Sequence, residues 1–597
     1  MKKNVLALSI AAMVGGLGFA SVASAGVIVG TGAAANDLLK IGTSNAVSFR
    51  MSEGGTGHNL VVPYFNAQNG NMTVLHLVNT DTVKGKAVKV RFRGAANSDD
   101  LLDFQVFLSP QDVWTAAVTQ GADGRLQLQS SDNTCTVPAL RSRPLVAGEA
   151  FDDVTAKEAG KLGFFNSSTG RLNPKLSDEQ KANGTREGYV EIFNMADITE
   201  EQWYGANFGT AGTARSPLYQ TIKHNASGVA ACNTAVLEAV ALETNFRDEA
   251  QAASAGLNAP TGQLMGDWYI QNVAQSTTYS GAATTLTAVT GANGTGTSAT
   301  GNFVLFPQSP VAAVTDETVN FVTADPLFRQ AAGTATDVIG TTKTAAGVTT
   351  GIAATAAPVI RAGYYDLPDM STPYLAALTG LADTDPETQA QALTQALAVD
   401  SVMNQYANDL SVSGKTDWVF SMPTRRYSVA LDYRGADTTA PAVAVFSRGV
   451  VGAAAAAEAF FHSGNSTVTA PRADARICVN AIGQAFFGRE EESRRNGAVL
   501  SPGEVPQARF CGETSVLSFA DTGASVLGAT VARQDTGRSA YTRGWASIAT
   551  YSDAAATVNG AGLPITGHAF LKLTNPSVSA GQSATYGITW PHRYTRR

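Results

Sequence analysis

The 597-residue sequence is poor in charged side chains and has no excess of basic ones. Asp, Glu, Lys and Arg make up only 15% of the chain, and the formal net charge is −7 at neutral pH. Proteins that bind nucleic acid cluster Lys and Arg against phosphate groups, so this balance argues against a nucleic-acid partner. The chain is instead rich in Gly, Ala, Ser and Thr, a composition closer to extracellular β-proteins than to cytosolic enzymes.

Cysteine is also scarce, with only Cys135, Cys232, Cys478 and Cys511. None of them has the C-x-x-C spacing of zinc sites and redox motifs. Four cysteines can pair in three ways, and their distribution over the two halves of the chain favours Cys135 with Cys232 and Cys478 with Cys511. Such disulfides form in an oxidising compartment, where each contributes about 2–4 kcal/mol to stability.

Long apolar runs are absent after the N-terminus, where no segment reaches the roughly 20 residues that a membrane-spanning helix requires. The first 25 residues have the features of a secretory signal peptide: Lys2 and Lys3, an apolar run, and the small residues Ala23-Ser24-Ala25. We therefore predict a signal peptide over residues 1–25. The mature chain would begin at Gly26, with a formal charge of −9 and no transmembrane segment.

Familiar catalytic motifs are missing as well. The sequence contains no G-x-S-x-G, no G-x-x-x-x-G-K-[ST] and no H-E-x-x-H, and its six histidines are scattered without metal-ligand spacing. These absences weaken the case for an enzyme, and we predict a protein without catalytic activity.

What the sequence does contain is a repeated β pattern. In "VKVRFR" (88–93) apolar residues alternate with basic ones, which predicts a strand with one apolar face and one basic, solvent-exposed face. We therefore expect a mainly β protein with two or more β-sandwich, immunoglobulin-like domains and a few helices. Similar strand signals occur in "NMTVLHLVNTD" (71–81), "GYVEIFNM" (188–195), "GDWYIQNV" (266–273), "TDWVFSMP" (416–423), "HAFLKLTN" (568–575) and "TYGITWPH" (585–592).

Two helices and a compositional boundary complete the predicted organisation. Thr199 and Gln202 resemble a capping box, which predicts a short helix over residues 198–205. Asp385 and Pro386 suit the start of an amphipathic helix over about 386–410. Residues 275–358 are rich in Thr, Ala and Gly and are predicted to be an insertion or linker. It would separate an N-terminal β-rich domain (26–274) from a C-terminal one (359–597).

An acidic knot separates two of the predicted strands. Asp99, Asp100 and Asp103 could bind Ca²⁺ through their carboxylate oxygens, although they lack the spacing of an EF-hand. They could equally form an acidic turn that faces Arg91 and Arg93 across a hairpin. The sequence leaves both interpretations open.

A second charged feature lies in the segment "WPHRYTRR" (590–597), which interleaves arginines with aromatic residues. Arg593, Arg596 and Arg597 could contact anionic groups such as the phosphates of lipopolysaccharide. A solvated tail is the alternative.

Several of these segments resemble one protein family. The resemblance is to the surface-layer proteins of β-proteobacteria, of the type found on nanopods, the tubes that sheathe outer-membrane vesicles. It implies a secreted, non-enzymatic protein that self-assembles as a lattice on the outer surface of a Gram-negative cell or on vesicle tubes. A secreted carbohydrate-binding adhesin or polymer-degrading enzyme is the alternative. The segments are "VVPYFNAQNGNMTVLHLVNTD" (61–81), "KAVKVRFRGAANSDDLLDFQVFLSPQDVW" (86–114), "GYVEIFNMADI" (188–198) and "TDWVFSMPTRRY" (416–427).

Overall fold

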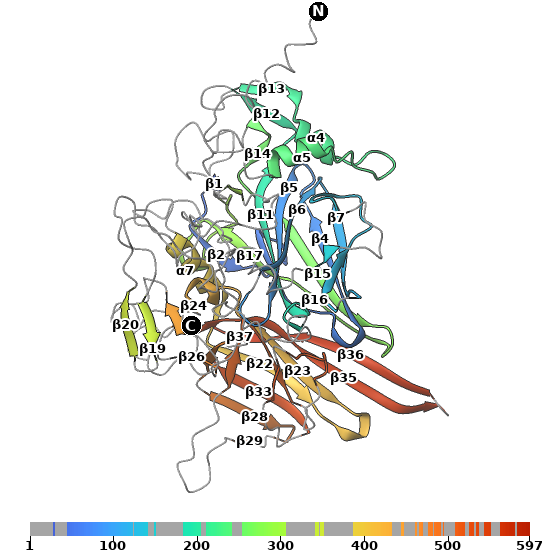
Figure 1. The fold of residues 1–597 in the computed structure, drawn as a ribbon, viewed down its shortest axis with the longest axis vertical. Coiled ribbons are helices and arrows are strands. Elements are labelled where there is room, and N and C mark those ends of the chain that lie inside the picture. Colours follow the sequence, from blue (N-terminus) through green and yellow to red (C-terminus); the bar gives the residue numbers. More distant parts are fainter. Residues whose placement is uncertain are drawn as a thin grey trace, which may run out of the picture.

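The protein is mainly β, as predicted, and antiparallel sheets from both halves of the chain dominate it (Figure 1). The immunoglobulin-like type and the number of domains stay predictions. The predicted signal peptide lies outside the described residues. A computed structural model describes most of residues 45–140, 183–305 and 386–432, shorter stretches between 443 and 596, and the isolated strands 28–29, 149–150, 341–344 and 347–351.

A six-stranded sheet, here called the outer sheet, forms one side of the N-terminal half. Leu75, Leu77 and Trp114 point into the core from alternate positions of two neighbouring strands, and the residues between them face outward. The outer sheet contains, in spatial order, β10 (Glu149–Ala150), β8 (Leu126–Gln129), β7 (Val113–Gln120), β4 (Asn71–Asn79), β15 (Leu264–Asn272) and β16 (Thr277–Ala282).

An eight-stranded central sheet packs against the inner face of the outer sheet. The rings of Phe104 and Trp114, one from each sheet, lie 5.4 Å apart between centroids, and the two inner faces share one apolar core. The pair is therefore a β-sandwich. The central sheet contains, in order, β2 (Ser48–Met51), β17 (Thr284–Val289), β3 (Asn59–Asn66), β11 (Glu187–Ile198), β5 (Gly85–Gly94), β6 (Asp100–Leu108) and β9 (Cys135–Val137), with β14 (Leu257–Asn258) beside β11.

Two five-stranded sheets build the C-terminal half. The first, called the shared sheet, contains β32 (Arg533–Asp535), β31 (Thr514–Ser518), β23 (Lys415–Ser421), β35 (Thr566–Ser579) and β36 (Gln582–Pro591). The second, called the C-terminal sheet, contains β29 (Ser493–Arg494), β28 (Gly483–Gly488), β33 (Arg543–Ala549), β22 (Ser401–Ala407) and β37 (Arg593–Thr595).

The shared sheet contributes to the apolar cores of both halves. Trp418 and Phe420 of β23 belong to the C-terminal core, whereas Val419 between them belongs to the core of the N-terminal sandwich. Phe570 of β35 reaches the same N-terminal core and lies 5.8 Å from Trp268 between ring centroids. A strand whose odd-numbered and even-numbered residues are both apolar is buried on both faces. This burial explains the uninterrupted apolar run "WVF" within "DWVFSM".

Helices cover one end of the central sheet, on the face that points away from the outer sheet. Leu218 and Ile222 of α4 (Pro217–Ile222) and Leu237 of α5 (Thr234–Ala241) pack there with Phe107 and Phe193. No helix of the described residues is long and apolar enough to cross a membrane.

Five smaller sheets complete the described strands. Three of them have two strands each: β1 (Ile28–Val29) with β18 (Val304–Leu305), β12 (Glu201–Tyr204) with β13 (Thr210–Arg215), and β21 (Ala398–Val399) with β34 (Leu563–Pro564). A four-stranded sheet contains β20 (Gly347–Gly351), β19 (Thr341–Thr344), β25 (Val443–Phe446) and β24 (Val429–Asp432), and a three-stranded one contains β26 (Ser466–Val468), β27 (Ile477–Asn480) and β30 (Arg509–Cys511).

Both helix predictions need correction. The helix predicted over residues 198–205 is wrong, because Glu201–Tyr204 is strand β12 and pairs with β13, so tertiary pairing overrides the local capping pattern. Helix α7 begins at Pro386 as predicted but ends at Leu397, well before residue 410. The segment after it alternates with period two and becomes β22 between β33 and β37.

The N-terminal sheets also continue past the predicted boundary at residue 274. Strands β16 and β17 fall within the predicted insertion (275–358), yet they complete the outer and central sheets as far as Val289. The other domain limits stay predictions.

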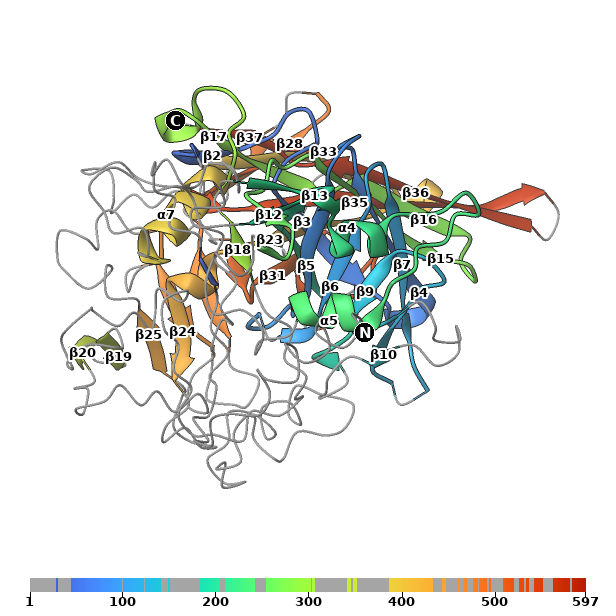
Figure 2. The ribbon, with the colours of Figure 1, turned by 90° about the horizontal axis from the view of Figure 1, so that it is seen from above.

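One hairpin projects from the body of the molecule. Figure 2 shows the red pair β35 and β36 extending well beyond the other described strands. The pairing runs from His568 opposite Pro591 to Ser579 opposite Gln582. Lys572 near the root donates a hydrogen bond to Gln275, whereas Val578 and Tyr586 are 53% and 58% exposed. The root of the hairpin is therefore anchored, and exposed apolar side chains lie farther out along it.

Candidate functional site

The acidic knot faces the basic strand across a hairpin. The register of β5 and β6 places Asp103 opposite Arg91 and Asp100 opposite Arg93. Lys89 Nζ lies 2.7 Å from Asp103 Oδ2, so an ammonium group already neutralises this carboxylate. Asp99 and the side chain of Asp100 lie outside the described residues, and a calcium site there stays a prediction. Among the residues that the structure describes, no cluster of three His, Cys, Asp or Glu side chains could hold a metal ion.

The basic face of β5 is buried, which makes the prediction of a solvent-exposed face wrong. The side chains of Lys89 and Arg93 are fully buried, and Arg91 is only 4% exposed. Burying a charge is costly unless it is paired, and the sheet provides the partner: Arg93 Nε lies 3.3 Å from Glu191 Oε2 on neighbouring β11. Alternation in the sequence shows that two faces differ but cannot show what covers each face.

The second partner of Glu191 comes from the other half of the chain. Arg426, in the turn η8 (Arg425–Tyr427) after β23, lies 2.6 Å from Glu191 Oε1 and donates a second hydrogen bond to Oε2 at 2.8 Å. It also donates to Tyr189 Oη at 2.6 Å. Four residues that join the central sheet to the C-terminal half are here called the ionic seam: Arg93, Tyr189, Glu191 and Arg426.

The turn that carries the acidic knot lies at the same junction. Ala95 O accepts a hydrogen bond from Thr514 N at 3.1 Å, and Ser98 Oγ lies 2.8 Å from Tyr189 Oη. Gly512 has a φ of +90°, and a Cβ atom there would lie 2.5 Å from the carbonyl oxygen of Ala95, so the close approach requires glycine. The knot therefore belongs to a structural contact between the two halves.

Both predicted disulfides are confirmed. Cys135 of β9 is bonded to Cys232, which lies between α4 and α5, and Cys478 of β27 is bonded to Cys511 of β30. The first bond spans 97 residues of sequence and ties the edge of the central sheet to the helical segment.

The arginine-rich segment is partly a strand rather than a solvated tail. Arg593 begins β37, which pairs with β22, and the side chains of Arg593 and Arg596 are exposed. His592 beside them is buried and its Nε2 lies 2.8 Å from Val419 O. Arg597 lies outside the described residues, and the anion contact of these arginines stays a prediction.

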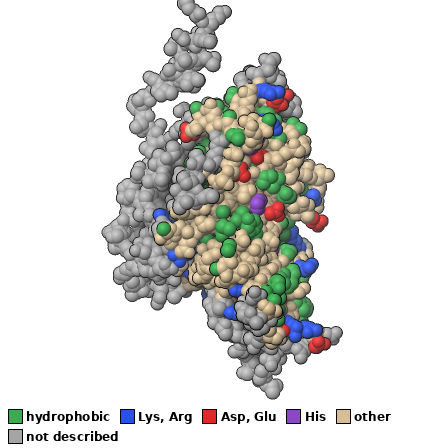
Figure 3. Space-filling model, turned by 90° about the vertical axis from the view of Figure 1, so that its right-hand side faces the viewer, with side chains coloured by type: hydrophobic (Ala, Val, Ile, Leu, Met, Phe, Trp, Pro, Cys, Tyr) green, Lys and Arg blue, Asp and Glu red, His purple; other side chains and the backbone are tan. Residues whose placement is uncertain are grey.

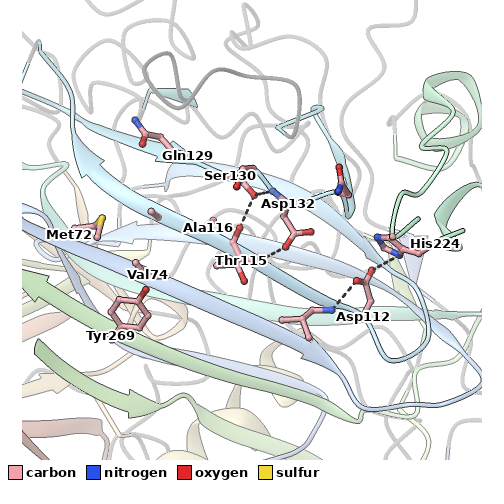
Figure 4. A pocket seen from close by; sticks show the side chains of 15 residues that line it. Met72, Val74, Asp112, Thr115, Ala116, Gln129, Ser130, Asp132, His224 and Tyr269 are labelled. Carbon is pink, nitrogen blue, oxygen red and sulfur yellow. Dashed lines mark hydrogen bonds and ion pairs between the residues drawn. The ribbon is translucent and has the colours of Figure 1, made fainter. Parts of the chain in front are cut away.

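A groove that sequence reasoning missed lies on the outward face of the outer sheet. Its volume is about 710 Å³, and Figure 3, which views this side of the molecule, shows hydrophobic side chains gathered beside acidic ones and a histidine. A row of residues in register crosses its floor: Tyr269 is opposite Val74, Val74 opposite Ala117, and Ala117 opposite Gln129. Val74 and Ala117 are small, so the sheet is hollowed between the larger flanking side chains. Figure 4 shows Val74 beside Tyr269, with Asp112 and His224 toward the other end of the groove.

Two loops form the rim at the other end of the groove. One follows β8 and carries Asp132 and Asn133, and the other follows α4 and carries His224. The disulfide between Cys135 and Cys232 joins these two loops close to the rim, so it fixes their spacing. The groove is thus a sheet surface with a covalently braced rim.

Backbone groups orient the two rim carboxylates. Asp112 accepts hydrogen bonds from Ser109 N at 3.0 Å and from Val113 N at 2.9 Å. Asp132 accepts from Thr115 N at 3.1 Å and from Thr134 N at 2.9 Å. These bonds hold both carboxylates in place without any ligand.

The carboxylates of Asp112 and Asp132 approach the same hydroxyl group, that of Thr134, so negative charge is concentrated there. Thr134 Oγ1 lies 2.8 Å from Asp132 Oδ1 and 3.3 Å from both oxygens of Asp112. Burial raises the pKa of Asp112 above its ordinary value and the charge of Asp132 adds to the rise, whereas His224 and the N–H of Ser109 lower it.

Ser109, His224 and Asp112 do not form a catalytic triad. In a triad the serine and the carboxylate approach different nitrogens of the imidazole ring. Here Ser109 Oγ lies 3.1 Å and Asp112 Oδ2 3.7 Å from the same atom, His224 Nδ1. The arrangement can hold a histidine at the rim, but it does not place a serine for proton transfer through the ring.

No protein-family model, curated protein sequence or solved structure is significantly similar to this chain. The interpretation of the groove and of the projecting hairpin therefore rests on their own geometry.

One sequence signal could have indicated the groove: the small outward-facing residues of "VWTAAV" (113–118). The tyrosine on the other side of the groove, on β15, is about 150 residues away in sequence, and only the strand register brings the two together.

Proposed function

We propose that this protein is a secreted, non-enzymatic surface-layer protein that self-assembles into a lattice on the outer surface of a Gram-negative cell or on vesicle tubes. The projecting β35–β36 hairpin is the observation that carries the proposal. The two disulfides support an oxidising, extracytoplasmic location, because such bonds persist there and are rare in the cytosol. Nucleic acid is not among the proposed partners.

The root of the hairpin packs closely on the body of the molecule. Phe570 near the root lies in the N-terminal core, and Gly587 packs so closely on β16 that a Cβ atom there would lie 2.4 Å from Thr278 O. The far end of the β35–β36 pair extends well beyond the other described strands (Figure 2), and Val578 and Tyr586 are exposed. An isolated two-stranded ribbon is at best marginally stable in water, so a contact with another molecule would stabilise this one.

The hairpin also lacks charged side chains along most of its length, although β35 contains Pro576. Natural edge strands are protected by charged residues, especially Lys, yet the sequence has no Asp, Glu, Lys or Arg from Leu573 to Pro591. Strand β36 is the last strand of the shared sheet. We assign a second copy of the chain as its partner, since a head-to-tail contact repeated between copies generates an extended array.

Two further contacts belong to the same proposal. The exposed Arg593 and Arg596 are assigned to anionic groups of lipopolysaccharide, because guanidinium groups bind phosphate through paired hydrogen bonds. Ca²⁺ is assigned to the carboxylates of Asp99, Asp100 and Asp103, so assembly should be tested with and without it.

The test compares assembly of the mature protein with that of Tyr586→Lys and Val578→Lys. Each variant places a charge on the hairpin and should raise the protein concentration needed for assembly about tenfold, since one lost contact of about 1.4 kcal/mol per copy has that effect. Val83→Lys is the matched control, because Val83 is 67% exposed on a loop away from the hairpin. Negative-stain electron microscopy and sedimentation, with Ca²⁺ and with a chelator, provide the readout.

The expected result is ordered arrays for the wild type and for Val83→Lys, and dispersed protein for the two hairpin variants. A wild type that stays monomeric in both conditions would rule out the lattice. Equal loss of assembly in Val83→Lys would assign the effect to general solubility rather than to the hairpin.

A further inference from the structure

We propose that the groove on the outer sheet binds a neutral saccharide, with Tyr269 as the stacking surface and the rim side chains as hydroxyl partners. This site is separate from the hairpin, and the inference does not depend on self-assembly. The volume of about 710 Å³ lies within the ~300–1,000 Å³ typical of small-molecule sites.

The aromatic wall of the groove is rigid. Tyr269 points outward from β15 and is half-buried, and the ring of His76 supports it with 5.7 Å between ring centroids. Thr115 Oγ1 lies 3.2 Å from His76 Nδ1 and fixes that ring in turn. A tyrosine held in this way offers an apolar surface to the C–H face of a pyranose ring without loss of side-chain entropy on binding.

The opposite side of the groove offers hydrogen bonds. Among the described residues, no hydrogen bond from protein engages the side-chain amides of Gln129 and Asn133, each of which can both donate and accept. Oδ2 of Asp132 accepts one hydrogen bond, from Thr115 N, within the described part of the chain, so it retains a lone pair for a ligand hydroxyl. Amide and carboxylate groups that surround an apolar floor suit a ring with an apolar face and a polar edge.

The charge of the groove favours a neutral ligand over an anionic one. The described side chains that line it include Asp112 and Asp132 but neither Lys nor Arg, so a phosphate, sulfate or uronic acid would be repelled. A free cation is a poorer fit, because backbone N–H groups already engage both carboxylates. The groove is open to solvent, which allows a polymer chain to pass through it.

The test uses native affinity electrophoresis in gels that contain dextran, galactomannan or arabinoxylan, with polygalacturonate as the acidic comparison. Ala117→Phe fills the floor of the groove from an outward position and should abolish the retardation of the protein. Tyr269→Ala removes the stacking surface and should weaken binding about tenfold. Val83→Phe, at a 67% exposed loop position that does not line the groove, is the control.

We expect retardation by at least one neutral polysaccharide, loss of it in Ala117→Phe, weaker retardation of Tyr269→Ala, and wild-type behaviour of Val83→Phe. Absence of retardation by all three neutral polymers would overturn the proposal, as would retardation that survives Ala117→Phe. Binding to polygalacturonate alone would assign the groove to another ligand class. None of the groove variants should alter array formation, so failure of this inference and failure of the lattice proposal are distinguishable.

Discussion

The ionic seam and the projecting hairpin distribute charge in opposite ways. At the seam, Arg93, Glu191 and Arg426 are charged and buried, whereas residues 573–591 of the hairpin carry no charged side chain and include the exposed Val578 and Tyr586. Buried charges that lose a partner are penalised far more than they stabilise when paired. We infer that the seam excludes alternative arrangements of the two halves, while the hairpin lacks the charges that would exclude a second chain.

Acidification should have the largest effect on the stability of the buried body, with little effect on array formation. Burial lowers the pKa of His58 and of His568 to about 4 and that of His592 to about 3. Because these values lie below the ~6.5 of the unfolded chain, the folded state is stable above pH 6.5 and loses stability as the pH falls, by roughly 3 kcal/mol for each histidine at pH 4. Thermal unfolding from pH 7.5 to pH 4 should therefore show a steep fall in Tm.

Asp417 partly offsets this loss of stability. Burial raises the pKa of its carboxyl group to about 6, so its ionisation destabilises the fold as the pH rises from 4 to 6, and its protonation stabilises the fold as the pH falls. Residues 573–591 of the hairpin include no Asp, Glu, His, Lys or Arg, so array formation should be unchanged between pH 5.5 and 8. A flat Tm down to pH 4 would contradict the assignment of the buried histidines as neutral.

Removal of Arg426 should have the next largest effect. Arg426→Met leaves Glu191 with a buried, partly unpaired charge, and breaking such a pair typically costs about 3–5 kcal/mol. Arg593→Met, at an exposed position of β37, should change the free energy of unfolding by less than about 0.5 kcal/mol. Urea unfolding measures both, and a loss below about 1 kcal/mol for Arg426→Met would show that the seam does not join the halves.

Shortening of the hairpin should have the smallest effect on stability. Replacing residues 574–585 by Asn-Gly joins Leu573 to Tyr586, which are already opposite each other, through a two-residue turn. The free energy of unfolding should change by less than about 0.5 kcal/mol, because the removed part contributes little to either core. The variant should nevertheless form no arrays, and a large fall in Tm would instead assign the hairpin a role within the monomer.

Local periodicity predicted most strands of this protein but not their surroundings. Strands β4, β11 and β15 follow from alternation in the sequence, and both disulfides follow from the distribution of four cysteines. The helix expected over 198–205 failed because pairing between β12 and β13, which lies outside any local window, outweighs a capping pattern.

The functional surfaces depend on register over long distances, which no local pattern contains. Tyr269 and Ala117 flank Val74 only because β15 and β7 both pair with β4. The burial of Arg93 likewise depends on Arg426, more than 300 residues later in the sequence. The sequence therefore predicted which residues form strands, and the structure was needed to show which strands meet.

The shared sheet has a consequence for the order in which the protein folds. Asn66 Nδ2 donates to Leu527 O across 461 residues, and Ser421 Oγ donates to Pro63 O across 358. Contacts this distant in sequence close slowly, so the N-terminal core cannot be completed until most of the chain has been made. The hairpin at 566–591 is made later still. The strand pair that we propose as the contact with a second copy thus appears only when its own partners within the chain are already present, which limits association of incomplete chains.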